Sequence, residues 1–263
     1  MQKLIGIDLD GTLLCDNKTI TDFTKQTLSE ATKYNHLVVL ATGRSFNGSK
    51  PYYDQLKLKT PLITFNGALI TLPDGTDIKQ VIPKKLVNSI YNDLNELFVT
   101  AFFNSKEKII SVNHNKDLEL LFNGAISKDT SEFDIITAHN HDILNVVVSI
   151  EEKDQMTFEN YFKDLPVTHR YWGSHEGLRF YDIHLVGVSK ATALKDVLGL
   201  YNLNKDQLIT FGDGPNDFEM LGLTKDGIAM FNASNELKTV AQYQTDFDNN
   251  SDGVAKYLVK YYL

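Results

Sequence analysis

The stretch LIGIDLDGT, residues 4–12, decides the fold of this chain. Its first four residues are mostly apolar and include two isoleucines, which is typical of a short buried β-strand. Asp8 and Asp10 follow directly and would project to the same side of an extended strand, because side chains alternate along it. Gly11 then lets the chain turn. Two carboxylates so close together cost free energy unless a cation or a shared proton offsets them. An acidic turn after a strand is the other interpretation of this segment alone.

Strand and helix patterns alternate on both sides of the middle of the chain. A helical pattern over residues 21–34 precedes a β-branched run at 37–41, and a third apolar run follows at 61–65. This alternation predicts parallel βαβ units whose strands are buried on both faces. After residue 188 the alternation returns, with a helical stripe over 189–201 and a strand at 208–211.

The middle of the chain predicts a different arrangement. The residue pattern there predicts one helix followed by two strands, and this order occurs twice. A short helix is predicted at residues 117–122. Such an order indicates an antiparallel α+β domain with its helices on one face. The predicted fold class is therefore α/β, with a parallel-sheet core domain formed by residues 1–82 and 188–263. An α+β domain of residues 83–187 is inserted into it.

Composition excludes several classes of protein. The chain has 263 residues, a hydrophobic share of 42% and a formal net charge of −8. These values do not suit a disordered chain or a coiled coil, and the charge gives no general attraction to nucleic acid or to an anionic membrane surface. No apolar stretch reaches the roughly 18 residues that a membrane-spanning helix needs. The single Cys15 forms no internal disulfide. We expect a cytoplasmic protein that is a monomer or a weak homo-oligomer.

The second strand and the later helix add candidates for binding an anion. Ligands of open parallel sheets bind beyond the carboxyl ends of the strands. There Thr42 and Gly43 offer a hydroxyl and backbone N–H groups near a helix start, although an ordinary turn has the same pattern. Lys190 follows Ser189, a good N-cap, and its charge opposes the helix dipole at a cost of ~0.3–1 kcal/mol. Either an anion rests between Lys190 and the helix start, or the ammonium simply extends into water.

The strand at 208–211 leads into GDGPND, residues 212–217. Its Pro215 suits the first position of a helix, so a purely structural helix start would look much the same. Asp213 and Asp217, however, join Asp8 and Asp10 at the same sheet edge. Four carboxylates without His or Cys in these motifs form a hard oxygen site, which suits Mg²⁺.

Taken together, four motifs resemble those of the haloacid dehalogenase-like hydrolases in their order along the chain. They are DLDGT at 8–12, ATGR at 41–44, Lys190 within VGVSKATAL at 186–194, and GDGPND at 212–217. The domain inserted between the second and third motifs is similar to that of the Cof-type subclass IIB phosphatases. The resemblance covers both ends of the core, whereas the middle domain matches by length and element order only. It implies a Rossmann-like core and an inserted α+β cap domain.

The resemblance also implies a function. The chain would be an Mg²⁺-dependent phosphatase of small-molecule phosphate monoesters, such as sugar phosphates or phosphorylated cofactors and their precursors. Asp8 would be the nucleophile that forms an aspartyl-phosphate, and Asp10 the general acid and base. The metal would be held by Asp8, the backbone carbonyl of Asp10, Asp213 and, through water, Asp217. The phosphoryl oxygens would be bound by the Leu9 N–H group, Thr42, Gly43, Lys190 and Asn216.

Three points stay open in the sequence. Arg170 and Trp172 offer a cationic and an aromatic group in the inserted domain and are candidates for substrate contact, although an ordinary strand pair with exposed aromatics is the alternative. A phosphomutase or phosphotransferase would use the same Asp8 and Asp10, and a non-catalytic sensor of phosphate ligands is the remaining class. The sequence does not name the physiological substrate.

Overall fold

The chain divides into two compact units. The structure, a computed structural model, describes residues 1–113, 130–132, 134, 138 and 140–263. The first unit consists of Met1–Gly43, Ser49–Ile78 and Ser189–Leu263, and the second of Arg44–Gly48 and Lys79–Val188. The domain boundaries that the sequence predicts, at residues 83 and 187, stay predictions.

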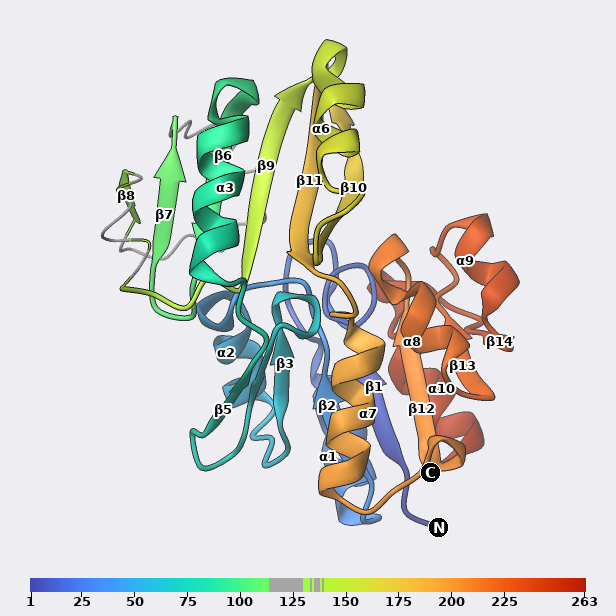
Figure 1. The fold of residues 1–263 in the computed structure, drawn as a ribbon. Helices are drawn as coiled ribbons and strands as arrows, with labels where there is room; N and C mark the ends of the chain where they lie inside the picture. Colours follow the sequence, from blue (N-terminus) through green and yellow to red (C-terminus); the bar gives the residue numbers. More distant parts are fainter. Residues whose placement is uncertain (114–129, 133, 135–137, 139) are drawn as a thin grey trace. The chain divides into compact units, whose positions relative to one another are not determined.

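A five-stranded parallel sheet forms the centre of the first unit (Figure 1). Its strand order is β14-β13-β12-β1-β2, so that strands from the N-terminal and the C-terminal parts of the chain form one sheet. The central strand β1 is buried along its whole length, which explains its continuous apolar sequence. The strands are β1 (Leu4–Ile7), β2 (Leu37–Leu40), β12 (Leu208–Gly212), β13 (Asp226–Ala229) and β14 (Tyr243–Gln244).

Helices cover this sheet in two groups. Helix α1 (Asp22–Lys33) packs with α10 (Gly253–Tyr261), and α7 (Lys190–Leu200) packs with α8 (Phe218–Gly222). In Figure 1, α7 lies in front of β1 and β12. The unit also contains α9 (Asn235–Val240), most of α2 (Phe46–Gln55), and the 3₁₀ turns η4 (Lys205–Gln207), η5 (Pro215–Asp217) and η6 (Asn249–Ser251).

The third apolar run does not simply extend the parallel sheet. Strand β3 (Leu62–Thr64) touches it through one parallel bridge between Ala41 and Ile63. It otherwise belongs to a separate three-stranded sheet with β4 (Leu69–Thr71) and β5 (Asp77–Lys79), and it pairs antiparallel with β4. The cause is the turn η1 (Phe65–Gly67), in which Phe65 and Asn66 both have positive φ and reverse the chain at once. The strand predicted at 61–65 is therefore present as β3, and its parallel pairing is limited to this one bridge.

A six-stranded sheet with helices on one face forms the second unit. Its strand order is β10-β11-β9-β6-β7-β8, and all pairs are antiparallel except β7 with β8. Helices α3 and α6 lie on the same face of this sheet (Figure 1), and their buried side chains join its core. The predicted helix at residues 117–122 lies outside the described residues. The elements are α3 (Lys84–Leu94), η2 (Asn95–Leu97), β6 (Phe98–Asn104), β7 (Ile109–Val112), β8 (Thr130–Glu132), β9 (Asn145–Glu151), η3 (Glu152–Asp154), α6 (Gln155–Tyr161), β10 (Val167–His175) and β11 (Leu178–Leu185).

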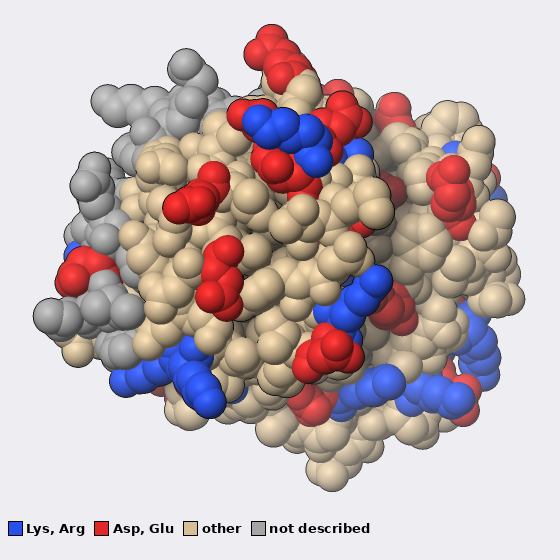
Figure 2. Space-filling model, turned by 45° about the horizontal axis from the view of Figure 1, so that its top comes forward, with Lys and Arg blue, Asp and Glu red and all other residues tan. Residues whose placement is uncertain are grey.

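The surface carries charges of both signs. On the face shown in Figure 2, acidic and basic side chains are scattered, and the described residues form no extended basic patch there. Among the described helices, none combines the length and the apolar character that crossing a membrane requires.

Candidate active site

Parallel pairing of β1 with β12 brings the first and last sequence motifs together. Ile7 is in register with Phe211, and the backbone N–H of Asp8 donates to the Phe211 carbonyl at 3.1 Å. Asp8 therefore leaves β1 beside the point where Asp213 leaves β12. Two carboxylates more than 200 positions apart in the sequence meet at the carboxyl edge of the sheet, where ligands of such folds bind.

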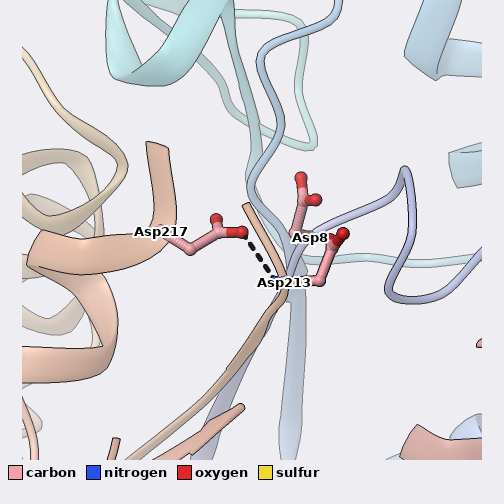
Figure 3. Close-up of side chains that lie close together, drawn as sticks. All are labelled: Asp8, Asp213 and Asp217. Carbon is pink, nitrogen blue, oxygen red and sulfur yellow. Dashed lines mark hydrogen bonds between the residues drawn. The ribbon is translucent and has the colours of Figure 1, made fainter. Parts of the chain in front are cut away.

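Asp217 completes an acidic cluster with Asp8 and Asp213. One carboxylate oxygen from each of the three lies within 4.8 Å of the others. Figure 3 shows these side chains converging from the ends of β1 and β12 and from the turn before α8. Asp217 is held in place because its Oδ2 accepts the backbone N–H groups of Asp213 and Gly214, each at 3.0 Å.

Lys190 lies fully buried against this acidic cluster. Its Nζ donates to Asp8 Oδ1 and to Asp217 Oδ1, each at 2.7 Å. The helix that carries it starts at an N-cap, Ser189, whose side chain accepts the Thr192 N–H at 3.1 Å. Of the two interpretations that the sequence allows for Lys190, an ammonium extended into water is thus excluded. When all three carboxylates are ionised, the one ammonium leaves an excess of two negative charges, since 3 − 1 = 2.

Burial and the repulsion between carboxylates shift Asp8 and Asp213 towards their neutral forms by raising their pKa values. Burial raises the pKa of Asp8 well above its usual range, and the charges of Asp217 and Asp213 add to this, while Lys190 opposes it. Burial and the Asp217 charge raise the pKa of Asp213 to about 6, although a hydrogen bond from Thr12 Oγ1 at 2.9 Å opposes the rise. Burial lowers the pKa of Lys190, but Asp217 and Asp8 outweigh it and raise that pKa overall. A cation among the carboxylates would relieve these costs.

Glycines keep the space around the acidic cluster free of side chains. Gly11 has φ of +70°, and a Cβ built on it would overlap the Asp213 carboxylate. A Cβ on Gly43 would lie 3.0 Å from Asn66 Oδ1 and 3.3 Å from Asn216 Nδ2. Both glycines therefore permit close approach of backbone and polar side chains.

A second polar group lies where β2 and β3 end. Thr42 is buried, and its carbonyl accepts the N–H of Asn66 at 3.0 Å. Asn216 Nδ2 donates to Asn66 Oδ1 at 2.9 Å. Thr42, Gly43 and Asn216 come from two distant motifs and are brought together through Asn66.

Asn66 contacts this group, although the sequence motifs assign no role to it. It is fully buried and has φ of 54°, a conformation that asparagine tolerates better than most residues. The Asn-Gly pair at residues 66–67 is the signal that could have indicated it, because such pairs mark turns with positive φ. Gly67 itself has φ of +102°, and a Cβ on it would overlap the Ser189 carbonyl.

Of the remaining candidates, Leu9 and Asp10 belong to the first unit and Arg170 and Trp172 to the second. Leu9 has a buried side chain, and its carbonyl accepts the N–H groups of Leu13 and Leu14. The Asp10 carboxylate is not a member of the acidic cluster and instead accepts a hydrogen bond from Lys18 Nζ at 2.7 Å. Arg170 and Trp172 lie on β10 in the second unit, next to a register shift between Tyr171 and Gly173. Arg170 is partly buried and Trp172 is exposed.

Comparison with known proteins assigns the family. The family model of haloacid dehalogenase-like hydrolases matches residues 5–258, nearly the whole chain. The chain belongs to the haloacid dehalogenase-like hydrolases. The predicted membership and enzyme class are thereby confirmed, because the relatives found are themselves named phosphatases.

Two relatives from Bacillus subtilis carry the same activity in their names. The chain is 30% identical over 274 residues to 5-amino-6-(5-phospho-D-ribitylamino)uracil phosphatase YitU, covering 98% of this chain and 97% of the relative. It is also 30% identical over 262 residues to 5-amino-6-(5-phospho-D-ribitylamino)uracil phosphatase YcsE, covering 97% and 93% of the two chains.

Solved structures confirm the fold class. The phosphatase BT1666 from Bacteroides thetaiotaomicron superposes with a TM-score of 0.84 at 23% identity, covering 99% of this chain and 95% of the other. The subclass IIB sugar phosphatase BT4131 gives 0.81 at 22% identity, covering 98% of each chain. The predicted α/β class is therefore confirmed for this hydrolase.

Proposed function

We propose that this phosphatase hydrolyses phosphate monoesters of small molecules in an Mg²⁺-dependent reaction that passes through an aspartyl-phosphate on Asp8. One observation carries the proposal: a buried cluster of three carboxylates that Lys190 only partly neutralises. Such a concentration of like charge is costly in a purely structural role and is typical of a site for a cation and a phosphate.

The residues present fit Mg²⁺. The cluster offers only oxygen ligands, which Mg²⁺ prefers, and Asp8 and Asp213 carry raised pKa values that a cation would lower. Asp8, Asp213 and the backbone carbonyl of Asp10 would hold the ion, with Asp217 beside them. When bound, Mg²⁺ neutralises charge so that an anionic nucleophile can approach an anionic phosphate.

The chain's own residues then perform the two transfers. A carboxylate oxygen of Asp8 attacks phosphorus, and the bond to the leaving oxygen breaks as Asp10 donates a proton to it. Asp10 next takes a proton from water, whose oxygen attacks the same phosphorus and releases phosphate from Asp8. Lys190, which contacts Asp8 at 2.7 Å, orients that carboxylate and would offset charge on the phosphoryl oxygens. The Leu9 N–H, Thr42, Gly43 and Asn216 would bind those oxygens.

The proposed substrate class is a phosphorylated sugar or polyol, alone or attached to a small ring. Two relatives at 30% identity are named for a phosphoribitylamino-uracil, which is a phosphorylated polyol joined to a pyrimidine. Arg170 and Trp172 stay proposals for contacts to the leaving group. The cytoplasmic location, the monomeric or weakly associated state and the lack of nucleic-acid and membrane partners stay predictions.

Phosphate release from a panel of sugar, polyol and nucleotide monophosphates tests this function. We expect release that needs Mg²⁺, stops with EDTA and falls by at least ~10³-fold in Asp8→Asn, since the nucleophile is lost. A thermal unfolding curve like that of the wild type would show that the variant is folded. Formation of an isomer or of a second phosphorylated product without free phosphate would instead indicate a mutase or transferase.

A covalent intermediate makes a further demand on the products. With methanol present, two substrates that share one phospho-enzyme must give the same ratio of methyl phosphate to phosphate, because the leaving group has already departed. A ratio that depends on the leaving group would contradict the aspartyl-phosphate.

A further inference from the structure

Asp10 is held by a partner outside the acidic cluster. Its Oδ1 accepts a hydrogen bond from Lys18 Nζ at 2.7 Å, and the two side chains are 26% and 47% exposed. Strand β1 ends at Ile7, and Gly11 turns the chain with positive φ, so Asp10 no longer follows the alternation of an extended strand. The Asp10 carboxylate thus has its orientation set by Lys18 rather than by the strand.

The turn that carries Lys18 has a defined and unusual backbone. Cys15 N–H donates to the Thr19 carbonyl at 3.0 Å, and Lys18 N–H donates to the Cys15 carbonyl at 2.8 Å. Lys18 itself has φ of +61°, a region that lysine seldom occupies. Such backbone persists only where surrounding contacts enforce it, and it concentrates at functional sites.

Contacts from distant parts of the first unit enforce this turn. Asn249, which is buried, donates through Nδ2 to the Leu14 carbonyl at 2.9 Å and to Asp16 Oδ1 at 3.0 Å. Asn250 Nδ2 donates to Asp16 Oδ2 at 2.9 Å, and the Tyr52 hydroxyl donates to the Lys18 carbonyl at 3.1 Å. Lys18 is therefore presented to Asp10 from both flanks of its turn.

Folding stability does not account for this arrangement. Half-exposed ion pairs add little to stability, because water screens them and two side chains must be ordered. Here a turn with positive φ at Lys18, held by Asn249 and Asn250, places the Lys18 ammonium against the Asp10 carboxylate. The carboxylate that it meets is the group to which the proposed function gives the proton transfers.

We propose that Lys18 is a positioning residue for Asp10: it holds the Asp10 carboxylate on the leaving-group side, apart from the phosphate-binding cluster, so that Asp10 can deliver its proton to the departing oxygen. This inference rests on the proposed phosphatase function. Its consequence depends on the substrate. A leaving alkoxide of a sugar phosphate needs that proton, whereas p-nitrophenolate is stable enough to leave without it.

The test compares Lys18→Met with wild type on two substrates, a hexose phosphate and p-nitrophenyl phosphate. For the hexose phosphate we expect kcat to fall about tenfold with little change in KM, a part of the 10²–10⁴-fold effect typical of general acid–base catalysis. For p-nitrophenyl phosphate we expect kcat to stay within about twofold, since proton delivery matters less there. Lys18→Arg should restore most of the hexose phosphate rate, because its guanidinium also donates to a carboxylate.

Two further variants separate positioning from general damage. In an Asp10→Asn background, Lys18→Met should cause no further loss, because the group that it positions is already gone. Lys25→Met removes a comparable surface contact, Lys25 Nζ to Asp22 Oδ1 at 3.0 Å, and should leave both rates unchanged. Equal losses on both substrates, or an additional loss in the Asp10→Asn background, would overturn the positioning role.

The outcomes also distinguish the two proposals. If wild type releases phosphate and Lys18→Met is indistinguishable from it on the hexose phosphate, this inference fails alone. If wild type releases no phosphate from any substrate, the proposed function fails and this inference fails with it.

Discussion

Asp217 and Asp182 are both fully buried carboxylates, one in each compact unit, and their surroundings differ. Asp217 lies with two other carboxylates and a buried ammonium, Lys190, at 2.7 Å. Asp182 accepts a hydrogen bond from Asn145 Nδ2 at 2.7 Å, and the Oδ1 of Asn145 accepts one from Asn104 Nδ2 at 3.1 Å. His184 Nδ1 lies 3.8 Å from Asp182 Oδ2. The first arrangement brings three acidic side chains and one ammonium together, whereas the second combines one carboxylate with amides and an imidazole.

This difference is the one expected between the proposed active site and a structural network. The contacts of Asp182 with the Asn145 amide and the His184 imidazole bring no second carboxylate beside it, so they do not concentrate like charge. The acidic cluster around Asp217 holds three carboxylates against one ammonium, and burial together with the neighbouring carboxylates raises the pKa of Asp8 and of Asp213. Burial of a polar group alone would not have distinguished the two places. The balance of charge around each carboxylate distinguishes Asp217 from Asp182.

Loss of Lys190 should have the largest effect on stability and activity, because it removes the ammonium from the acidic cluster. Lys190→Met leaves Asp8 and Asp217 buried without their ammonium, and removal of one partner from a buried ion pair costs about 3–5 kcal/mol. We expect the midpoint of urea unfolding to fall accordingly and kcat to drop by about 10²–10³-fold. Mg²⁺ should restore part of the stability, since it also supplies positive charge. An unfolding midpoint equal to that of wild type would show that the pair is not needed to hold the carboxylates.

The pH dependence of stability should follow from Asp213. Its pKa of about 6 in the folded protein exceeds the ordinary value of 3.8, so the folded state binds more protons than the unfolded state between about pH 4 and 6. Stability without metal should therefore fall as pH rises through this window, by on the order of 1–3 kcal/mol, and stay low above it. Asp8, whose pKa is also raised, acts in the same direction.

Thermal unfolding at pH 5 and pH 8, with and without Mg²⁺, measures this effect. Because the metal needs ionised carboxylates, we expect Mg²⁺ to raise Tm clearly more at pH 8 than at pH 5. Asp213→Asn cannot titrate and should show a smaller dependence on pH without metal and a reduced response to Mg²⁺. A response to Mg²⁺ that is equal at both pH values would contradict the assignment of the metal to these carboxylates.

The sequence predicts those parts of the site that lie at the ends of parallel strands. Asp8 and Asp213 meet because two parallel strands end at the same edge, and that follows from the apolar runs before them. Lys190 stood out because a cation in the first turn opposes the helix dipole, and the structure shows what compensates it. In these cases a local pattern carries the information.

Other parts depend on contacts that no local pattern contains. Lys18 reaches Asp10 because Asn249, over 230 positions away, holds the turn between them. Asn66 joins Asn216 because positive φ at residues 65 and 66 reverses the chain, and the same reversal takes β3 out of the parallel sheet. Turn geometry of this kind is decided by tertiary packing, and sequence periodicity does not report it.

Conversion of Asp182 or Asp217 into asparagine removes one charge with very little change in side-chain shape, so it tests what each charge contributes. Asp182→Asn keeps an oxygen that can accept from Asn145, so we expect a loss of about 1 kcal/mol and an unchanged rise in Tm on addition of Mg²⁺. Asp217→Asn removes a charge from the acidic cluster and a partner of Lys190, so the Mg²⁺-induced rise in Tm should become smaller. Measurement of both variants side by side, at pH 8 with saturating Mg²⁺ and with EDTA, compares the two carboxylates under one set of conditions. If Asp182→Asn weakened the Mg²⁺ response as much as Asp217→Asn does, charge balance would not be what separates the site from the network. Asp182 and Asp217 would then contribute equally to the response of the protein to Mg²⁺.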